Sequence, residues 1–457
     1  MELSHALRLE QPVTLAITGA GGKTTALFQL ARQLCRSSGS VVLVSATTHL
    51  AVGQLALADH HYEIQSLEDF KPFQKGFPPG VLLFTGQQIE EDERVAGLGL
   101  ELLEELHRLA EISNSSLLLE ADGSRQRPLK APADHEPPVP PWVDQVLVVA
   151  GLSVIGKSLN SSWVHRPELI ARLTGLILGN PVNPLAVVQV LSHPAGGLKN
   201  IPPNARRVVL LNQADDEILQ AIGKSMTDSL ARVFDAVLIA ALNPPTGASG
   251  VLMVSEPIAA VLLAAGSSSR FGRAKQLVSW DGEALVRRTA RIALEAGLAP
   301  VIVVSGSYAS GVEAALAGLP VELVFNPDWE TGQSSSVRAG VQSLPGSAGG
   351  AVFLLCDQPF INPQLIRRLV DLHQSGLDAI IAPMVDGQRT SPVLFDRRTF
   401  PDLLKLEGDT GGRALFSRYP VKWMEWLDRS ILFDIDTPED YQRLLEVADD
   451  KHSGPVE

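Results

Sequence analysis

The chain has 457 residues, of which 45% are hydrophobic and 19% charged, and its formal net charge at pH 7 is −13. This length predicts two or three domains with buried cores. The acidic balance argues against a nucleic-acid partner, because phosphate backbones bind basic surfaces.

Two further absences narrow the class of protein. Cys35 and Cys356 are the two cysteines, too few for a disulfide framework or a zinc cluster. The N-terminus has no basic segment followed by an apolar run, and no apolar segment reaches membrane-spanning length. We therefore expect a cytoplasmic protein without a membrane partner.

A glycine-rich loop follows the first expected strand. Residues 14–18 form an apolar strand, 19–25 read G-A-G-G-K-T-T, and 26–35 repeat apolar residues at helical spacing. This order is typical of a phosphate-binding loop, in which the helix N-terminus faces the anion. Lys23 would contact the β- and γ-phosphates, and Thr24 would ligate Mg²⁺. We predict a nucleotide-binding set of Gly21, Gly22, Lys23, Thr24 and Thr25. A glycine-rich turn without a ligand is the alternative, because the usual pattern has a further glycine at the position of Ile17.

Apolar strands alternate with helical stretches through this half of the chain, as in a doubly wound α/β domain. Glu120 and Asp122 follow one of these strands, so one of them could hold Mg²⁺ through water; a capping or turn role is the alternative. N-Q-A-D at 212–215 is similar to the guanine-binding N-K-x-D of GTPases, but Gln213 replaces the lysine and favours a plain Asx-turn. The expected elements are strands at 41–44, 81–84, 117–119 and 207–211 and a helix at 94–110.

Residues 14–215 resemble the selenium-dependent hydroxylase accessory family, which is linked to selenium cofactor biosynthesis. The shared motifs are the loop at 19–25, E-A-D-G-S at 120–124, K-A-P at 130–132, H-E-P at 135–137 and V-H-R-P-E at 164–168. The resemblance implies a P-loop-like accessory domain at 1–245 and names a pathway rather than a reaction. A Pro- and Gly-rich segment at 243–250 predicts a linker.

The second half opens with a buried strand at 257–265 and a loop of small residues. Glycine and serine let backbone N–H groups approach phosphate oxygens closely. Arg270 and Lys275 are placed to offset the charge of a triphosphate and of departing pyrophosphate. An ordinary strand-to-helix turn with stray basic residues is the alternative. We predict that Arg270 and Lys275 are catalytic and that the nucleotide contacts Leu263, Ala264, Ala265 and Gly266.

The segment 263–275 resembles L-A-A-G-x-S-x-R-x-G-x-x-K, the signature of nucleotidyltransferases of the molybdenum cofactor cytidylyltransferase type. The resemblance runs to the end of the chain. It implies a MobA-like NTP transferase domain at 255–457, with a Rossmann-like, GT-A-like α/β fold. The chain would then consist of two doubly wound domains.

Asp357 is the clearest catalytic carboxylate, because it follows the apolar strand 352–356 and would lie in the crevice where α/β proteins bind ligands. Nucleotidyl transfer requires Mg²⁺, and we expect Asp357 to hold it. Asp436 is the expected second metal ligand, because a strand at 433–436 would place Asp434 and Asp436 on one face. A cap on the final helix is the alternative role of Asp436.

Two serines fit the same resemblance. Residues 332–336 match G-x-S-x-S, which implies that Ser334 and Ser336 contact the base or the ribose. N-capping of the following helix by Ser334 is the alternative.

The family pattern also implies a pterin-binding side. Residues 408–413 match G-D-x-G-x-R, so Asp409 and Arg413 are the expected substrate-binding residues. Residues 387–395 match G-x-R-x-x-P-V-L-F, although Ser391 stands where the family has His or Asn.

The resemblance as a whole implies transfer of CMP from CTP to a molybdopterin-type cofactor with release of pyrophosphate. Mg²⁺ would be the cofactor, and a molybdenum hydroxylase apoenzyme would be the recipient partner. Two alternatives stay open: transfer to another small phosphate, such as a sugar phosphate or methylerythritol phosphate, or a nucleotide-gated chaperone for cofactor insertion. Arg413 favours the pterin substrate over the sugar substrates.

Overall fold

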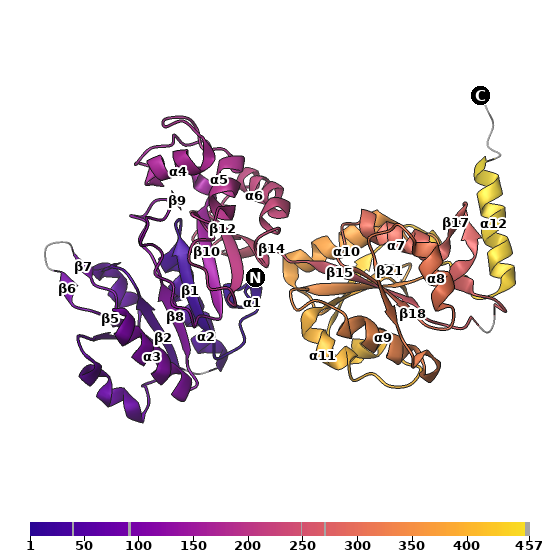
Figure 1. Cartoon of the computed structure of the whole chain (residues 1–457), viewed down its shortest axis with the longest axis horizontal. Coiled ribbons are helices and arrows are strands. Elements are labelled where there is room, and N and C mark those ends of the chain that lie inside the picture. The colour runs from indigo at the N-terminus through magenta and orange to yellow at the C-terminus, as the bar shows by residue number, and fades with distance from the viewer. Residues whose placement is uncertain (39–40, 90–92, 248, 269–270, 453–457) are drawn as a thin grey trace. The chain divides into compact units, whose positions relative to one another are not determined.

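The computed structural model describes residues 1–38, 41–89, 93–247, 249–268 and 271–452. The chain forms two compact units, Met1–Ser255 and Glu256–Glu457. Each unit is built on its own mostly parallel sheet, so the expected α/β class is confirmed (Figure 1). Among the helices in these ranges, none is both long and apolar enough to cross a membrane.

The described residues of the first unit form a nine-stranded sheet that is parallel except for one antiparallel pair at one edge. Its strands, from edge to edge, are β14 (Gly250–Ser255), β13 (Ala236–Ala241), β12 (Arg206–Asn212), β10 (Gln145–Gly151), β1 (Thr14–Gly19), β8 (Ser116–Glu120), β2 (Val41–Ala46), β5 (Gly80–Thr85) and β4 (His60–Glu63). The chain fills one side of β1 with β2, β4 and β5 and later continues on the other side with β10, β12 and β13. Such a switch in direction creates a crevice beside β1, where α/β proteins bind ligands.

The strands near the middle of this sheet are buried on both faces, as parallel sheets require. All seven residues of β10 are buried. Alternate strand residues, such as Ala16 and Val148, belong to one apolar cluster with Leu103 of α3 (Leu100–Ile112) and Met226 of α6 (Glu217–Leu230). The helix α2 (Lys23–Ser38) packs against β1, β2, β5 and β8. The helices are α1 (Leu3–Ala6), α2 (Lys23–Ser38), α3 (Leu100–Ile112), α4 (Pro167–Thr174), α5 (Pro184–Ser192) and α6 (Glu217–Leu230).

The expected helix at 94–110 is wrong in its first third. Arg94–Val95 form a short strand, β7, and α3 begins only after Gly99. Gly97 explains the difference, because a Cβ there would lie 2.5 Å from the carbonyl oxygen of Ala46. The backbone of residue 97 therefore packs against the end of β2 and is not available to start a helix.

The expected linker at 243–250 lies within the first unit. It connects β13 to β14, which pair as antiparallel neighbours at the edge of the same sheet. The chain therefore passes to the second unit only after Ser255.

The described residues of the second unit form an eight-stranded mixed sheet. Its strands are β19 (Glu322–Phe325), β18 (Val301–Ser305), β15 (Ile258–Ala264), β20 (Gly350–Leu355), β23 (Val393–Asp396), β21 (Ile380–Val385) and β22 (Gln388–Arg389), with β24 (Val421–Glu425) also paired to β21. The chain leaves β15 toward β18 and β19 and then returns on the other side to β20. The switch point therefore lies between β15 and β20.

Helices cover both faces of this second sheet. Ala260 and Leu262 of β15 join one apolar cluster with α7 (Leu285–Glu295), α8 (Ala309–Leu316) and α10 (Pro363–Gly376). Ala259 and Val261 join the opposite cluster with α9 (Gln333–Gln342) and α11 (Phe400–Leu403). Figure 1 shows α7 and α10 on one side of the sheet and α9 and α11 on the other. The last helix is α12 (Pro438–His452).

Glu136 connects separate parts of the first unit. Its carboxylate accepts hydrogen bonds from Lys130 Nζ at 2.8 Å and from Arg166 at 2.7 and 3.0 Å. Lys130 also pairs with Asp122 at 2.8 Å. Burial opposes ionisation of Glu136, but the hydrogen bonds from Arg166 and Lys130 outweigh it and lower the pKa of Glu136 to about 2.

We expect Glu136→Gln to lower the free energy of unfolding of the first unit by about 1–3 kcal/mol at neutral pH, because Lys130 and Arg166 lose a charged partner. The folded pKa of about 2 lies below the ordinary value of 4.5. The contribution of Glu136 is therefore complete above pH 4.5 and is lost as the pH falls toward 2. Urea unfolding followed by circular dichroism at successively lower pH measures both effects.

Glu168→Gln is the matched control for this experiment, because Glu168 is exposed and forms no ion pair within the described ranges. It should change neither the stability nor its pH dependence. A stability difference between wild type and Glu136→Gln that does not shrink in acid would contradict the assignment.

Candidate nucleotide-binding sites

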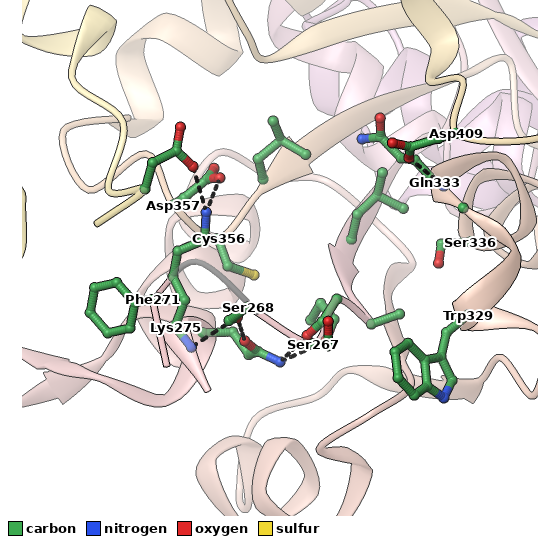
Figure 2. A pocket seen from close by; sticks show the side chains of 18 of the residues that line it. Ser267, Ser268, Phe271, Lys275, Trp329, Gln333, Ser336, Cys356, Asp357 and Asp409 are labelled. Atoms are coloured by element: carbon green, nitrogen blue, oxygen red, sulfur yellow. Dashed lines mark hydrogen bonds and ion pairs between the residues drawn. The ribbon is translucent and has the colours of Figure 1, made fainter. Parts of the chain in front are cut away.

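A cavity of about 430 Å³ opens at the C-terminal ends of β15 and β20. The loop after β15, the start of α9 and the end of β20 form its wall. Figure 2 shows Lys275 and Asp357 on one side of it and Trp329, Gln333 and Asp409 on the other. The cavity thus lies at the switch point of the sheet, where the topology favours ligand binding.

Lys275 holds two carboxylates together at this cavity. Its Nζ lies 2.7 Å from Asp357 Oδ2 and 3.2 Å from Asp436 Oδ1, although these residues are 82 and 161 positions away in the chain. Burial disfavours the ammonium group, but the two carboxylates outweigh it and raise the pKa of Lys275. Lys275 is therefore positively charged at physiological pH.

Asp357 has a second oxygen that could bind a cation. Its Oδ1 is buried and forms no hydrogen bond with a described residue. No three His, Cys, Asp or Glu side chains among the described residues are arranged to hold a metal. Mg²⁺, however, commonly takes one or two carboxylates and completes its shell with waters and substrate phosphates. Asp357 and Asp436 fit that requirement.

A backbone hydrogen bond, not a strand, brings Asp436 to the cavity. The expected strand at 433–436 is wrong, because these residues have no regular secondary structure. Instead, the N–H of Ile435 donates to the carbonyl oxygen of Asp357 at 2.9 Å, and the Ile435 side chain is buried. This bond places Asp436 beside Asp357.

The alternative role of Asp436 as a helix cap is wrong. The N–H of Asp440 donates to Thr437 Oγ1 at 3.2 Å, and Asp440 Oδ2 accepts from the N–H of Thr437 at 2.9 Å. These two residues close the first turn of α12, and the Asp436 carboxylate faces Lys275 instead.

Asp434 does not share the environment of Asp436. Its Oδ1 accepts a hydrogen bond from Gln358 Nε2 at 2.9 Å. Burial and the nearby charges of Asp357 and Asp436 raise the pKa of Asp434. Gln358 is thus a supporting residue that the sequence patterns did not reveal.

Gln276 shapes the loop after β15. Its Nε2 donates to the carbonyl oxygens of Ala264 and Gly266, both at 3.2 Å, and its Oε1 accepts from Ser268 Oγ at 3.1 Å. Ser268 Oγ in turn accepts from the N–H of Lys275 at 3.1 Å. Gln276 was not among the predicted site residues, and the available signal for it was its place next to Lys275 in the sequence.

The loop residues predicted to contact a nucleotide all line the cavity: Leu263, Ala264, Ala265 and Gly266. The carbonyl oxygen of Ala265 accepts from the N–H of Ser307 at 3.2 Å, which ties the loop to the end of β18. Arg270, predicted to be catalytic, lies outside the described residues. Cys356 also lines the cavity, but burial, followed by the charge of Asp357, raises its pKa to about 12, so its thiol stays protonated.

Ser334 and Ser336 occupy different positions. Ser336 lines the cavity, and its Oγ accepts from Asn326 Nδ2 at 3.0 Å. Ser334 is only 1% exposed, accepts from Arg338 at 3.3 Å, and is not among the described residues of the cavity wall. Capping by Ser334 is wrong, because the N-cap residue of α9 is Gly332 and Ser334 lies inside the helix as its second residue.

Asp409 reaches the cavity, whereas Arg413 does not. Asp409 lines the wall, and its Oδ1 accepts from the N–H of Gln333 at 3.3 Å, at the first turn of α9. Arg413 donates to Ser391 Oγ at 3.2 Å and is not among the described lining residues. Ser391 thus partners Arg413 at the position where the family has His or Asn.

A larger cavity, of about 1200 Å³, opens at the C-terminal ends of β1 and β8 in the first unit. Its wall includes the whole predicted set of Gly21, Gly22, Lys23, Thr24 and Thr25. Gly21 has a φ of +82°, and a Cβ there would lie 2.3 Å from the nitrogen of Gly151. The loop therefore requires glycine at this position.

Lys23 lies among oxygen atoms beneath this loop. Its Nζ donates to the carbonyl oxygen of Gly19 at 2.8 Å and lies 3.7 Å from Glu120 Oε1 and 3.4 Å from Asp122 Oδ1. Thr24 Oγ1 donates to Glu120 Oε2 at 2.8 Å. Burial raises the pKa of Glu120, although Lys23 opposes the shift. The structure therefore brings the predicted lysine and threonine together with both strand-end carboxylates.

Asn212 joins the glycine-rich loop to the neighbouring strands. Its Nδ2 donates to the carbonyl oxygen of Gly21 at 2.8 Å, and its Oδ1 accepts from the N–H of Leu242 at 3.1 Å. The expected Asx-turn is wrong, because such a turn bonds the Asn oxygen to the backbone two residues on.

Comparison with known proteins assigns each unit to a family. Residues 15–168 match the YqeC protein family, and residues 260–423 match the MobA-like NTP transferase domain. The chain is 32% identical to the protein YqeC of Escherichia coli (strain K12) over 47% of this chain and 84% of that protein.

Relatives that match the second unit include the following two proteins. Nicotine blue oxidoreductase of Paenarthrobacter nicotinovorans is 31% identical over 41% of this chain and 96% of that protein. Molybdenum cofactor cytidylyltransferase of Escherichia coli (strain K12) is 25% identical over 40% of this chain and 92% of that protein. Both resemblances inferred from the sequence motifs are therefore confirmed. The chain belongs to the YqeC family through its first unit, and its second unit is a nucleotidyltransferase of the MobA-like NTP transferase family.

Proposed function

We propose that the second unit transfers CMP from CTP to the terminal phosphate of a molybdopterin-type cofactor and releases pyrophosphate. The first unit would be a P-loop-like, nucleotide-binding accessory domain for maturation of a molybdenum hydroxylase in the cytoplasm. The observation that carries the proposal is Lys275, held between Asp357 and Asp436 in the wall of the cavity. The likeness to a molybdenum cofactor cytidylyltransferase supports the choice of substrates.

The reaction requires positioned charges rather than a protein nucleophile. An oxygen of the cofactor phosphate forms a bond to the α-phosphorus of CTP, and the bond to the bridging oxygen breaks, leaving its electrons on pyrophosphate. Lys275 would offset the charge that develops on the leaving group. Mg²⁺, held by Asp357 and Asp436, would neutralise charge on the phosphates. The protonated Cys356 thiol is consistent with direct transfer.

Asp357→Asn is expected to slow pyrophosphate release by about 10²–10³-fold. The amide keeps the shape of the side chain but removes the charge that would hold Lys275 and Mg²⁺. The measurement is pyrophosphate release from CTP with molybdenum cofactor over a range of Mg²⁺ concentrations, with folding checked by circular dichroism. Asp328→Asn, at an exposed aspartate outside the cavity wall, is the matched control. Near-normal turnover of Asp357→Asn at saturating Mg²⁺ would exclude the metal role.

CTP is expected to be preferred over GTP, and Ala265→Gly is expected to shift the preference toward GTP. Ala265 lines the cavity, so its methyl group narrows the approach of a purine to the backbone, whereas a pyrimidine still fits. Assays of pyrophosphate release with each nucleotide, with and without molybdenum cofactor, measure this preference. Equal use of GTP by the wild-type protein would replace the cytidylyl assignment with a general nucleotidyltransferase.

Lys23→Ala is expected to weaken nucleotide binding by the first unit and to leave CMP transfer unchanged, because the two loops belong to different units. Binding of fluorescent nucleotides and the transferase assay would be measured on the same preparation. The transferase rate then also reports whether the second unit is intact. An equal loss of both activities would show that the units share one site or are tightly coupled.

A further inference from the structure

The cavity of the first unit is larger and more basic than a phosphate-binding loop alone requires. Its volume of about 1200 Å³ exceeds the roughly 300–1,000 Å³ of ordinary small-molecule sites. Its described lining residues include three carboxylates and five cationic side chains, namely Lys23, Arg94, Arg125, Arg127 and Arg166. In a chain with a net charge of −13, this surplus concentrates positive potential at one place.

Within the described residues, three of these cations form no ion pair with a carboxylate, namely Arg94, Arg125 and Arg127. Lys23 is held by Glu120 and Asp122, and Arg166 is held by Glu136. Arg125 and Arg127 form no ion pair with any residue that the structure describes. Arg125 is exposed and Arg127 half-buried, so their charges are available to form charge-assisted hydrogen bonds with a ligand in the cavity.

The backbone fixes these two arginines next to the glycine-rich loop. The N–H of Gly21 donates to the carbonyl oxygen of Arg127 at 3.0 Å, and Lys130 Nζ donates to the carbonyl oxygen of Gly123 at 2.7 Å. Both ends of the segment 123–127 are therefore anchored. The segment presents its arginines beside the loop that would bind the nucleotide.

His165 lines the same cavity, and nearby positive charges affect its pKa. Burial, followed by the charges of Arg166, Lys130 and Arg125, lowers the pKa of His165 to about 4. An anion bound here would offset those charges and raise the pKa of His165.

We propose that Arg125 and Arg127 bind a second small substrate that carries a phosphate or carboxylate group, beside the nucleotide. The proposal rests on nucleotide binding by the glycine-rich loop, proposed above. The loop amides, Lys23 and Thr24 would serve the triphosphate, so the two arginines are additional to what the nucleotide needs. The first unit would then have a two-substrate site rather than a nucleotide switch.

The test uses the full chain saturated with a non-hydrolysable ATP or GTP analogue. Inorganic phosphate and, separately, citrate are then titrated by calorimetry, and the anion that binds identifies the phosphate or the carboxylate class. Arg125→Gln and Arg127→Gln are each expected to weaken anion binding by about tenfold or more, with the affinity for the analogue unchanged. Arg232→Gln, at an exposed arginine of the same unit outside the cavity wall, is the matched control.

Two outcomes would overturn the proposal. One is that neither anion binds the analogue-saturated protein. The other is that Arg127→Gln weakens analogue binding instead, because the arginines would then belong to the nucleotide site. NMR titration of His165 gives an independent readout: its pKa should rise with the anion in wild type but not in Arg127→Gln.

Failure of the proposed nucleotide binding would look different. In that case the analogues would not bind the wild-type protein at all. Anion binding that is lost in Arg127→Gln but retained in Lys23→Ala would still support the second site.

Discussion

The site of the second unit depends on one ammonium group placed between two carboxylates. Without Lys275, the carboxylates of Asp357 and Asp436 would repel each other. Lys275 follows the glycine-rich loop, Asp357 follows β20 and Asp436 precedes α12, so the ion pairs join three separate segments. An apolar cluster that includes Phe271, Trp280, Ile435 and Leu444 packs the same segments together and supports this arrangement.

In the first unit, Lys23 also lies close to two carboxylates, but it is more deeply buried than Lys275. The Lys23 side chain is 2% exposed and pairs with carboxylates at the end of a central strand, whereas the Lys275 side chain is 19% exposed. A buried ion pair is costly to break, because the remaining charge loses its partner without gaining water. A ligand of the first unit must therefore replace the contacts of Lys23 with its own oxygens, as a triphosphate can. Because Lys275 is more exposed to water, it would lose less electrostatic stabilisation on turning toward a ligand.

Strands and loops whose formation depends on neighbouring residues could be predicted from the sequence. The runs that became β1, β8, β15 and β20 were recognisable because central parallel strands are buried on both faces. The order of strand, glycine loop and lysine likewise located Lys23 and Lys275. Asp357 could be predicted because it lies two residues after the end of such a strand, β20.

Contacts between distant residues could not be predicted in the same way. The Ile435 N–H bond to Asp357, not strand alternation, places Asp436. Asn212 bonds to Gly21 across 191 positions, and nothing near Asn212 in the sequence signals that contact. The false start of the helix at residue 94 has the same origin, because Gly97 packs against Ala46, a residue from another part of the sheet.

The two cavities differ in charge, so a metal ion would contribute differently to phosphate binding at each of the two glycine-rich loops. The described wall of the second cavity carries one cation, Lys275, against four carboxylates, Glu330, Asp357, Asp409 and Asp436. A divalent cation held there would neutralise part of this charge and so favour binding of a triphosphate. The described wall of the first cavity carries five cations against three carboxylates. It could therefore attract a polyanion directly, and a metal bound there would serve mainly to orient the phosphates of such a ligand.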